Sequence, residues 1–325
     1  MKIDNVVYMI NSGCNFRCKF CLNNWKYDSK PMSNLKLDEK LKILDKLKEI
    51  NVENLTISGG EPLLDKDLPD FVNYGFKLGF NMNLLTNGSL IKEEFLEKIE
   101  GKLESIQVSL EGDEDVHNLL TETKSFRKVV ENIKLTKSKN FKLMTNFTIT
   151  KLNSQNLDEY VKLLKTLKVD VANFTRIYPS GYGKKNWKDL MIDVKEYEKF
   201  ILQLNDLAVK NKDIIFRIAG PTPMCLLEKN KINLYFNTCG AGVNEIAINP
   251  DGEILPCPSW QEGIGNILKE DFKTILNNPK MKKITDRTEL NSTCKTCNNF
   301  SKCKGGCLLH VINSSEGRDP YMIKV

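Results

Sequence analysis

Apolar residues in the first half of the chain follow two alternating patterns. Short runs rich in Val, Ile and Leu, at residues 4–10 and 55–57, have the length and composition of buried strands. Between them Leu37, Leu41 and Leu44 recur at helical spacing, which predicts an amphipathic helix. The alternation continues to residue 176, and it predicts helices at 67–78, 91–99, 126–136 and 157–167 and strands at 81–85, 105–110, 142–148 and 170–176.

This order of elements predicts an α/β fold. Six strands that alternate with helices form a parallel sheet joined by right-handed crossovers. We therefore expect a partial (β/α)6 barrel of the TIM type over residues 1–182. A predicted helix at 194–209 and an apolar run at 214–218 mark residues 183–222 as a bridge and linker. Residues 223–325 are expected to form a small cysteine-rich domain.

Three cysteines follow the first predicted strand, with the spacing Cys14-x3-Cys18-x2-Cys21. On one loop this spacing can place three thiolates on three corners of a cubane [4Fe-4S] cluster, which leaves the fourth iron open to a small chelating molecule. Buried apolar cysteines and a zinc site are the alternatives. Both are disfavoured, because polar and charged residues separate the three cysteines and the next one along the chain is Cys225.

Candidate ligand-binding residues follow the other predicted strands at their carboxyl ends, where parallel barrels build their active sites. Gly59 and Gly60 follow the second strand, and without a Cβ they let the backbone approach a ligand closely, although an ordinary turn would need them equally. Asn87 follows the third strand, Ser109 ends the fourth and Arg176 closes the sixth. Asn87 can equally be a turn residue, and Arg176 can equally pair with a nearby carboxylate.

Composition narrows the range of functions. The 325-residue chain has a net charge of +6 and a pI near 8.6, but its lysines alternate with acidic residues along predicted helices, as at residues 36–49. This pattern is typical of solvated helix faces rather than of a nucleic-acid-binding surface. The apolar runs are too short to span a membrane and no signal-peptide segment is found, so we expect a cytoplasmic protein. Its ten cysteines then favour metal binding over disulfides.

Most of the remaining cysteines lie in the last third of the chain. Cys239 and Cys257 flank two short apolar runs joined by the turn sequence Asn-Pro-Asp-Gly at 249–252, which predicts a hairpin. Four more follow within fourteen residues, at Cys294, Cys297, Cys303 and Cys307. Taken alone, this last group also fits a zinc ribbon.

The N-terminal cysteine pattern resembles the signature of the radical S-adenosylmethionine (SAM) enzymes, with Phe20 before its last cysteine and a Ser-Gly-Gly-Glu-Pro run at 58–62. The C-terminal cysteines resemble SPASM, an extension of such enzymes that carries auxiliary iron-sulfur clusters. The resemblance covers nearly the whole chain. It implies that SAM chelates the open iron and that its site is formed by Phe20, Gly59, Gly60, Glu61, Asn87, Ser109 and Arg176.

The resemblance also implies how the other cysteines divide. The nearer auxiliary cluster would be bound by Cys239, Cys257 and Cys307, and the outer one by Cys294, Cys297 and Cys303. The last cysteine of the SPASM pattern is absent from residues 308–325, so the outer cluster would take Asp319 or His310, keep an open iron or be incomplete. Cys225 could complete the nearer cluster, donate a hydrogen atom as a catalytic residue, or lie buried; we expect a ligand.

The family cleaves SAM reductively and uses a 5'-deoxyadenosyl radical to abstract a hydrogen atom from substrate. The run from Ser109 to Gly112, followed by His117, resembles the peptide-modifying branch, although Glu111 and Asn118 replace its commoner aspartates. We therefore expect a ribosomally made peptide as substrate, which receives a crosslink or another oxidative modification. We expect His117 to be a structural residue.

The expected partners are this peptide, with recognition left to the barrel mouth, the tail or a leader-binding partner, and a reductant such as flavodoxin or ferredoxin. One alternative is maturation of a sulfatase to formylglycine, which is disfavoured because Pro258, and not an aspartate, follows Cys257. Another is dehydrogenation or epimerisation of a small sugar or alcohol. A zinc-bearing binding protein with a degenerate barrel is the non-enzymatic alternative, and the complete cysteine and glycine motifs disfavour it.

Overall fold

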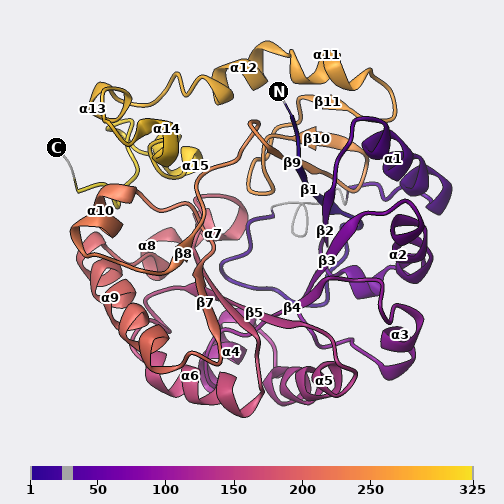
Figure 1. Cartoon of the computed structure of the whole chain (residues 1–325), viewed down its shortest axis with the longest axis horizontal. Coiled ribbons are helices and arrows are strands. Elements are labelled where there is room, and N and C mark those ends of the chain that lie inside the picture. Colours follow the sequence, from indigo (N-terminus) through magenta and orange to yellow (C-terminus); the bar gives the residue numbers. More distant parts are fainter. Residues whose placement is uncertain (1, 24–31, 324–325) are drawn as a thin grey trace.

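The computed structural model describes residues 2–23 and 32–323. Its strands form one sheet in the order β11-β10-β9-β1-β2-β3-β4-β5-β6-β7-β8. Each of the first six strands is parallel to the next. The sheet curves into an open barrel with helices around it (Figure 1), which confirms the predicted α/β class. These six strands are β1 (Asn5–Met9), β2 (Asn54–Ser58), β3 (Asn81–Thr86), β4 (Ser105–Ser109), β5 (Leu143–Ile149) and β6 (Val171–Arg176).

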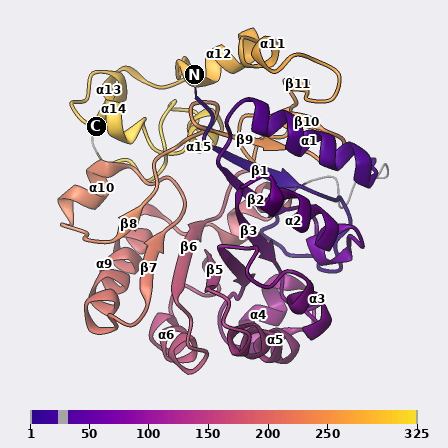
Figure 2. The ribbon, with the colours of Figure 1, turned by 45° about the vertical axis from the view of Figure 1, so that its right-hand side comes forward.

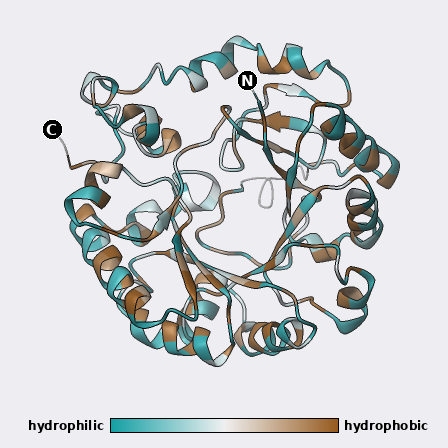
Figure 3. Cartoon of the chain, in the orientation of Figure 1, coloured by the Kyte–Doolittle hydropathy of each residue, from teal (hydrophilic) through white to brown (hydrophobic). Residues whose placement is uncertain are grey.

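The crossover helices cover the outer face of the sheet and bury one side of each helix. In α1 the apolar residues Ile43, Leu44 and Leu47 are buried at helical spacing, while lysines and acids occupy most of the other faces. Figure 3 shows this mixture of hydrophobic and hydrophilic residues on each peripheral helix. The helices of this half are α1 (Leu37–Glu49), α2 (Leu68–Lys77), α3 (Glu93–Lys98), α4 (Glu114–Thr121), α5 (Phe126–Ser138) and α6 (Leu157–Thr166), with a short 3-10 helix, η1 (Pro62–Leu64).

The sheet does not end at the sixth strand, so the prediction of six strands is too low. The apolar run that we expected to be part of a bridge is a seventh parallel strand, β7 (Ile215–Ile218), which pairs with β6. The two-residue strand β8 (Tyr235–Phe236) extends the same edge. Because β7 has only four residues, its alternating burial was too short a pattern to distinguish a sheet strand from a connecting segment.

The predicted hairpin forms the other edge of the sheet. Strand β9 (Glu245–Ile248) is antiparallel to β10 (Glu253–Leu255), as predicted, and β11 (Gly265–Asn266) follows. Strand β9 also pairs in parallel with β1, with Glu245 opposite Asn5. The C-terminal third therefore adds to the barrel sheet itself.

Short helices complete the chain around this sheet. The bridge contains α7 (Gly181–Lys185), α8 (Trp187–Leu190) and the long α9 (Val194–Lys210). The boundaries of the three predicted regions stay predictions. Within the described residues, no helix is long and apolar enough to cross a membrane. The C-terminal helices are α10 (Met224–Lys229), α11 (Phe272–Leu276), α12 (Pro279–Thr285), α13 (Ser292–Lys295), α14 (Phe300–Cys303) and α15 (Leu308–Ile312).

Candidate active site

One cavity of about 850 Å³ lies at the carboxyl ends of the parallel strands. It brings together the N-terminal cysteine loop and every residue predicted to bind SAM. The structure thus gathers side chains from the ends of β1, β2, β3, β4 and β6 at one place, as a parallel barrel does. The predicted residues that line it are Cys14, Cys18, Cys21, Phe20, Gly59, Gly60, Glu61, Asn87, Ser109 and Arg176.

Backbone hydrogen bonds hold the cysteine loop in place. The amides of Arg17 and Lys19 donate to the carbonyls of Thr121 (3.2 Å) and Leu120 (2.9 Å) at the end of α4. On the far side, the amide of Tyr182 in α7 donates to the carbonyl of Cys21 (2.8 Å). The three cysteines of the loop are partly exposed free thiols, so they are available as ligands.

The glycine loop packs directly against the cysteine loop. The amide of Gly60 donates to Asn11 O (2.9 Å), and that of Glu61 donates to Gly13 O (2.7 Å). A Cβ on Gly60 would lie 2.0 Å from Gly13 O, which is far inside van der Waals contact. Only glycine therefore fits at position 60 without moving one of the two loops.

Glu61 and Asn87 tie these loops to the strand ends. Glu61 is fully buried, and its carboxylate accepts hydrogen bonds from Thr86 Oγ1 (2.6 Å) and Asn87 N (2.7 Å). The side chain of Asn87 donates in turn to Asn15 Oδ1 (2.8 Å). Both residues thus position the loops that line the cavity, and their predicted contacts with SAM stay a prediction.

Arg176 pairs with a carboxylate, and this confirms the alternative role that the sequence analysis gave it. It is buried, and its guanidinium donates to both oxygens of Asp319 (2.9 and 2.8 Å). The Tyr321 ring lies 4.8 Å from the guanidinium carbon. Arg176 lines the cavity, but its charge is already compensated by Asp319.

Similar contacts engage Asp319 and His310, the two side chains considered as the fourth ligand of the outer cluster. Asp319 also accepts from Cys307 N (2.9 Å), and the nearby Arg176 keeps the pKa of its carboxyl below the ordinary value despite burial. His310 places Nε2 3.1 Å from the carbonyl of Ile177, and burial lowers its pKa to about 3. Neither side chain lines the pocket that holds the outer cysteines.

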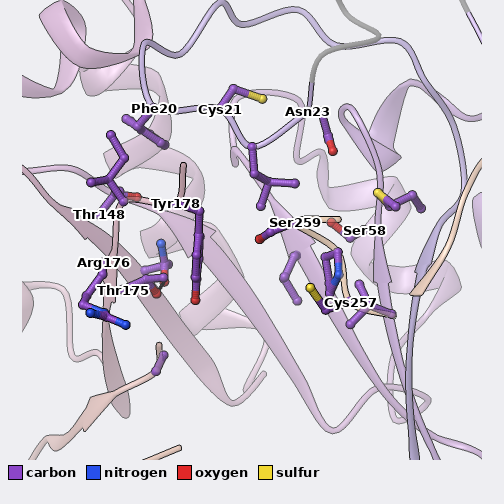
Figure 4. Close-up of a pocket in the computed structure, with 18 of the residues that line it drawn as sticks. Phe20, Cys21, Asn23, Ser58, Thr148, Thr175, Arg176, Tyr178, Cys257 and Ser259 are labelled. Carbon is purple, nitrogen blue, oxygen red and sulfur yellow. Dashed lines mark hydrogen bonds between the residues drawn. The ribbon is translucent and has the colours of Figure 1, made fainter. Parts of the chain in front are cut away.

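The three cysteines predicted for the nearer cluster line the same cavity. Burial, and then the charges of Cys239 and Cys307, raise the pKa of Cys257, as expected for thiols that lie close together. Figure 4 shows Cys21 and Phe20 near one end of this cavity and Cys257 near the other.

Two further residues of this cavity were missed from the sequence. Tyr178 lies between its two ends together with Ser259 (Figure 4), and it belongs to the segment directly after β6. Glu245 begins β9, and its charge contributes to the raised pKa of Cys257. The sequence offered a signal for Tyr178, because this residue closely follows Arg176 at the end of the sixth predicted strand. Glu245 is a polar residue at the start of an apolar run, and that position gave little reason to select it.

The outer cysteines line a second, smaller pocket, and Cys225 is there with them. The prediction that Cys225 completes the nearer cluster is therefore wrong. Met322 also lines this pocket, with its Sδ 3.3 Å from Cys294 Sγ. The missing last cysteine of the SPASM pattern was the signal that could have suggested this place for Cys225.

The donor sets fit iron-sulfur clusters. Three groups of three, four and three thiols account for all ten cysteines, and all ten are free. Among the described residues, no three His, Cys, Asp or Glu side chains are close enough together to hold a single metal ion. A cubane instead takes one thiolate at each of several irons, so its ligands stand around a larger centre.

Comparisons with known proteins agree with this geometry. Residues 8–167 match the model of the radical SAM superfamily, and residues 239–298 match that of SPASM, an iron-sulfur cluster-binding domain. The chain belongs to the radical SAM superfamily and carries a C-terminal SPASM domain. It is thus an enzyme whose cofactors are SAM and iron-sulfur clusters.

Several curated proteins are similar over almost the full chain. The AdoMet-dependent heme synthase of Methanosarcina barkeri is 24% identical over 319 residues, which are 93% of this chain and 90% of that protein. Mycofactocin maturase MftC of Mycobacterium tuberculosis is 25% identical over 330 residues, or 98% of this chain and 82% of its own length.

Solved structures share the fold. Streptococcus suis SuiB bound to precursor peptide SuiA has a TM-score of 0.79 at 18% identity and covers 98% of this chain and 74% of SuiB. The structure of anSMEcpe with bound AdoMet and Kp18Cys peptide has a TM-score of 0.75 at 21% identity, with 98% and 93% covered.

Proposed function

We propose that this protein modifies a ribosomally made peptide by hydrogen-atom abstraction, with a [4Fe-4S] cluster on Cys14, Cys18 and Cys21 and with SAM beside it. One observation carries the proposal: the cysteine loop, the glycine loop and the nearer SPASM cysteines line a single cavity. When bound, the cluster and SAM supply a 5'-deoxyadenosyl radical by reductive cleavage. The relative MftC is named a maturase, and SuiB was solved with a precursor peptide, which supports a peptide substrate.

The residues of this chain hold and orient the reactants. The bonds from Arg17 and Lys19 to the end of α4 fix the cysteine loop from the backbone. Gly60 brings the glycine loop against it, and Glu61 and Asn87 fix that loop to the end of β3. The rigid arrangement keeps the reacting groups in one geometry, which is the main contribution that a protein makes to cofactor chemistry.

Cys239, Cys257 and Cys307 would hold the nearer auxiliary cluster at this cavity, and such a cluster would supply an acceptor for an electron from the substrate. This favours oxidative products such as a crosslink. We propose flavodoxin or ferredoxin as the electron donor and, for substrates with a leader, a leader-binding partner.

The first experiment measures SAM cleavage. Anaerobically reconstituted protein is mixed with SAM and dithionite, and 5'-deoxyadenosine is quantified. We expect turnover in the wild type and none in the Cys14→Ala/Cys18→Ala/Cys21→Ala variant. Lys19→Ala is the matched control in the same loop, because it keeps the backbone bond to Leu120 and removes only a side chain that pairs with the half-exposed Glu122 at 4.0 Å. Deoxyadenosine from the triple variant would contradict the proposal.

The substrate class needs a separate experiment, because the heme synthase is also a relative. Cells of the source organism are grown in deuterated medium, and their small-peptide fraction and their non-peptide metabolites are tested separately. We expect deuterium to appear in 5'-deoxyadenosine with the peptide fraction. Transfer from the metabolite fraction alone would overturn the peptide assignment and leave SAM cleavage intact.

A further inference from the structure

We propose that Cys225 is the fourth thiolate ligand of the outer auxiliary cluster, together with Cys294, Cys297 and Cys303. The inference rests on the proposed function in one respect, which is that these cysteines hold an iron-sulfur cluster. Cys225 is the second residue of α10, and it lines the same small pocket as the other three.

Packing of two helices fixes this position. The amide of Met224 donates to Cys303 Sγ (3.3 Å) at one end of α10, and Asn299 donates to Glu228 Oε2 (2.7 Å) towards the other. Helix α10 is therefore attached to the α14 segment at two points that bracket Cys225. Both ribbon views place α10 beside α13 and α14 (Figures 1 and 2).

The other candidate ligands are less suitable. Asp319 is committed to Arg176, and His310 lies against Ile177 outside this pocket. Met322 is in the pocket, but its thioether is a neutral and weak donor, whereas clusters of this kind are held by thiolates. Cys225, which precedes the hairpin in the chain, thus takes the place of the SPASM cysteine that is absent from residues 308–325.

The test counts iron in a chain that has no SAM cluster. In the Cys14→Ala/Cys18→Ala/Cys21→Ala background, two auxiliary cubanes give about eight iron atoms per chain. Adding Cys225→Ala should remove at least one iron and change the electron paramagnetic resonance (EPR) spectrum of one cluster. Met322→Leu is the matched control in the same pocket and should leave both unchanged.

Circular dichroism detects whether Cys225→Ala has a folding defect, and Cys225→Ser provides a more conservative second variant at this position. This variant should keep more iron than Cys225→Ala but show a shifted EPR spectrum. If both Cys225 variants retain the full iron content and the parent spectrum, or if Met322→Leu has the larger effect, the proposal is wrong. The iron count is independent of SAM cleavage, so a failure of the proposed function would be recognised separately.

Discussion

Glu111 and His117 form a buried pair whose charges the protein suppresses. Glu111 Oε2 accepts a hydrogen bond from Thr148 N (2.6 Å), Oε1 has no partner among the described residues, and burial raises its pKa to about 8. His117 Nδ1 accepts from Glu111 N (3.3 Å), and burial lowers its pKa to about 4. Both side chains are therefore mainly uncharged near neutral pH. This supports the structural role predicted for His117.

The pair predicts a pH dependence of stability. The folded protein keeps the proton on Glu111 up to about pH 8, whereas the unfolded chain releases it near the ordinary pKa of 4.5. Its contribution to stability is therefore complete below 4.5 and is lost as the pH rises through about 8. Between about pH 7 and 8, where His117 is mainly neutral in both states, the loss amounts to about 1 kcal/mol.

Glu111→Gln should remove this slope. Melting temperatures of the anaerobic wild type should fall across this range more steeply than those of the variant. Glu114→Gln, at a partly exposed residue of α4, is the control and should follow the wild type. Parallel curves for wild type and Glu111→Gln would show that the carboxyl is not protonated in the folded state.

Single residues also show how far the sequence could predict the site. The spacing of Cys14, Cys18 and Cys21 lies within one loop, so the motif alone predicted that they act together. The place of Cys225 depends on the packing of α10 against the α14 segment, which no local pattern encodes. Arg176 was ambiguous for the same reason, because its partner Asp319 lies 143 residues away.

At the scale of elements, the contact between the cysteine loop and the glycine loop leaves no space for an added side chain at Gly60. Gly60→Ala would place a Cβ 2.0 Å from Gly13 O and force the loops apart. We expect SAM to bind at least about tenfold more weakly, a loss of about 1.4 kcal/mol. Equilibrium dialysis of the reconstituted protein against labelled SAM measures this effect.

The matched control lies on the other side of the same contact. A Cβ on Gly13 would meet only Leu64, at 3.9 Å, so Gly13→Ala should bind SAM nearly as the wild type does. Equal affinities for the two variants would mean that the spacing of the loops does not define the SAM site.

The elements themselves were predictable in proportion to their burial and length. The central strands β1 to β6 are five to seven residues long, and their apolar runs stood out between amphipathic helices. The added strands β7 and β8 have four and two residues, and their pairing depends on the barrel edge that receives them. Such strands are set by tertiary contacts more than by local preference.

At the scale of the molecule, the Arg176–Asp319 pair connects β6 of the barrel to the C-terminal segment. Asp319→Asn leaves a buried guanidinium without its counter-charge, which costs on the order of 3–5 kcal/mol. We expect a clearly lower melting temperature and weaker retention of the nearer cluster, because Asp319 also accepts from Cys307 N.

A double variant separates charge from packing. Arg176→Met/Asp319→Leu should be more stable than Asp319→Asn, because it removes both buried charges. Asp286→Asn, at an exposed residue, is the control. If Asp319→Asn melts with the wild type, the ion pair does not hold the two parts together.

The parallel pairing of β1 with β9 sets an order of events during synthesis. Strand β1 has one of its two neighbours within the next fifty residues, but the other is residues 245–248. Until that segment emerges, one row of amides and carbonyls on β1 has no strand to pair with, which is the kind of edge that recruits other chains. Truncated products that end before Glu245 are therefore expected to aggregate. The free edge of β1 is covered once residues 245–248 have been made, at a time when most of the SPASM domain has not yet been synthesised.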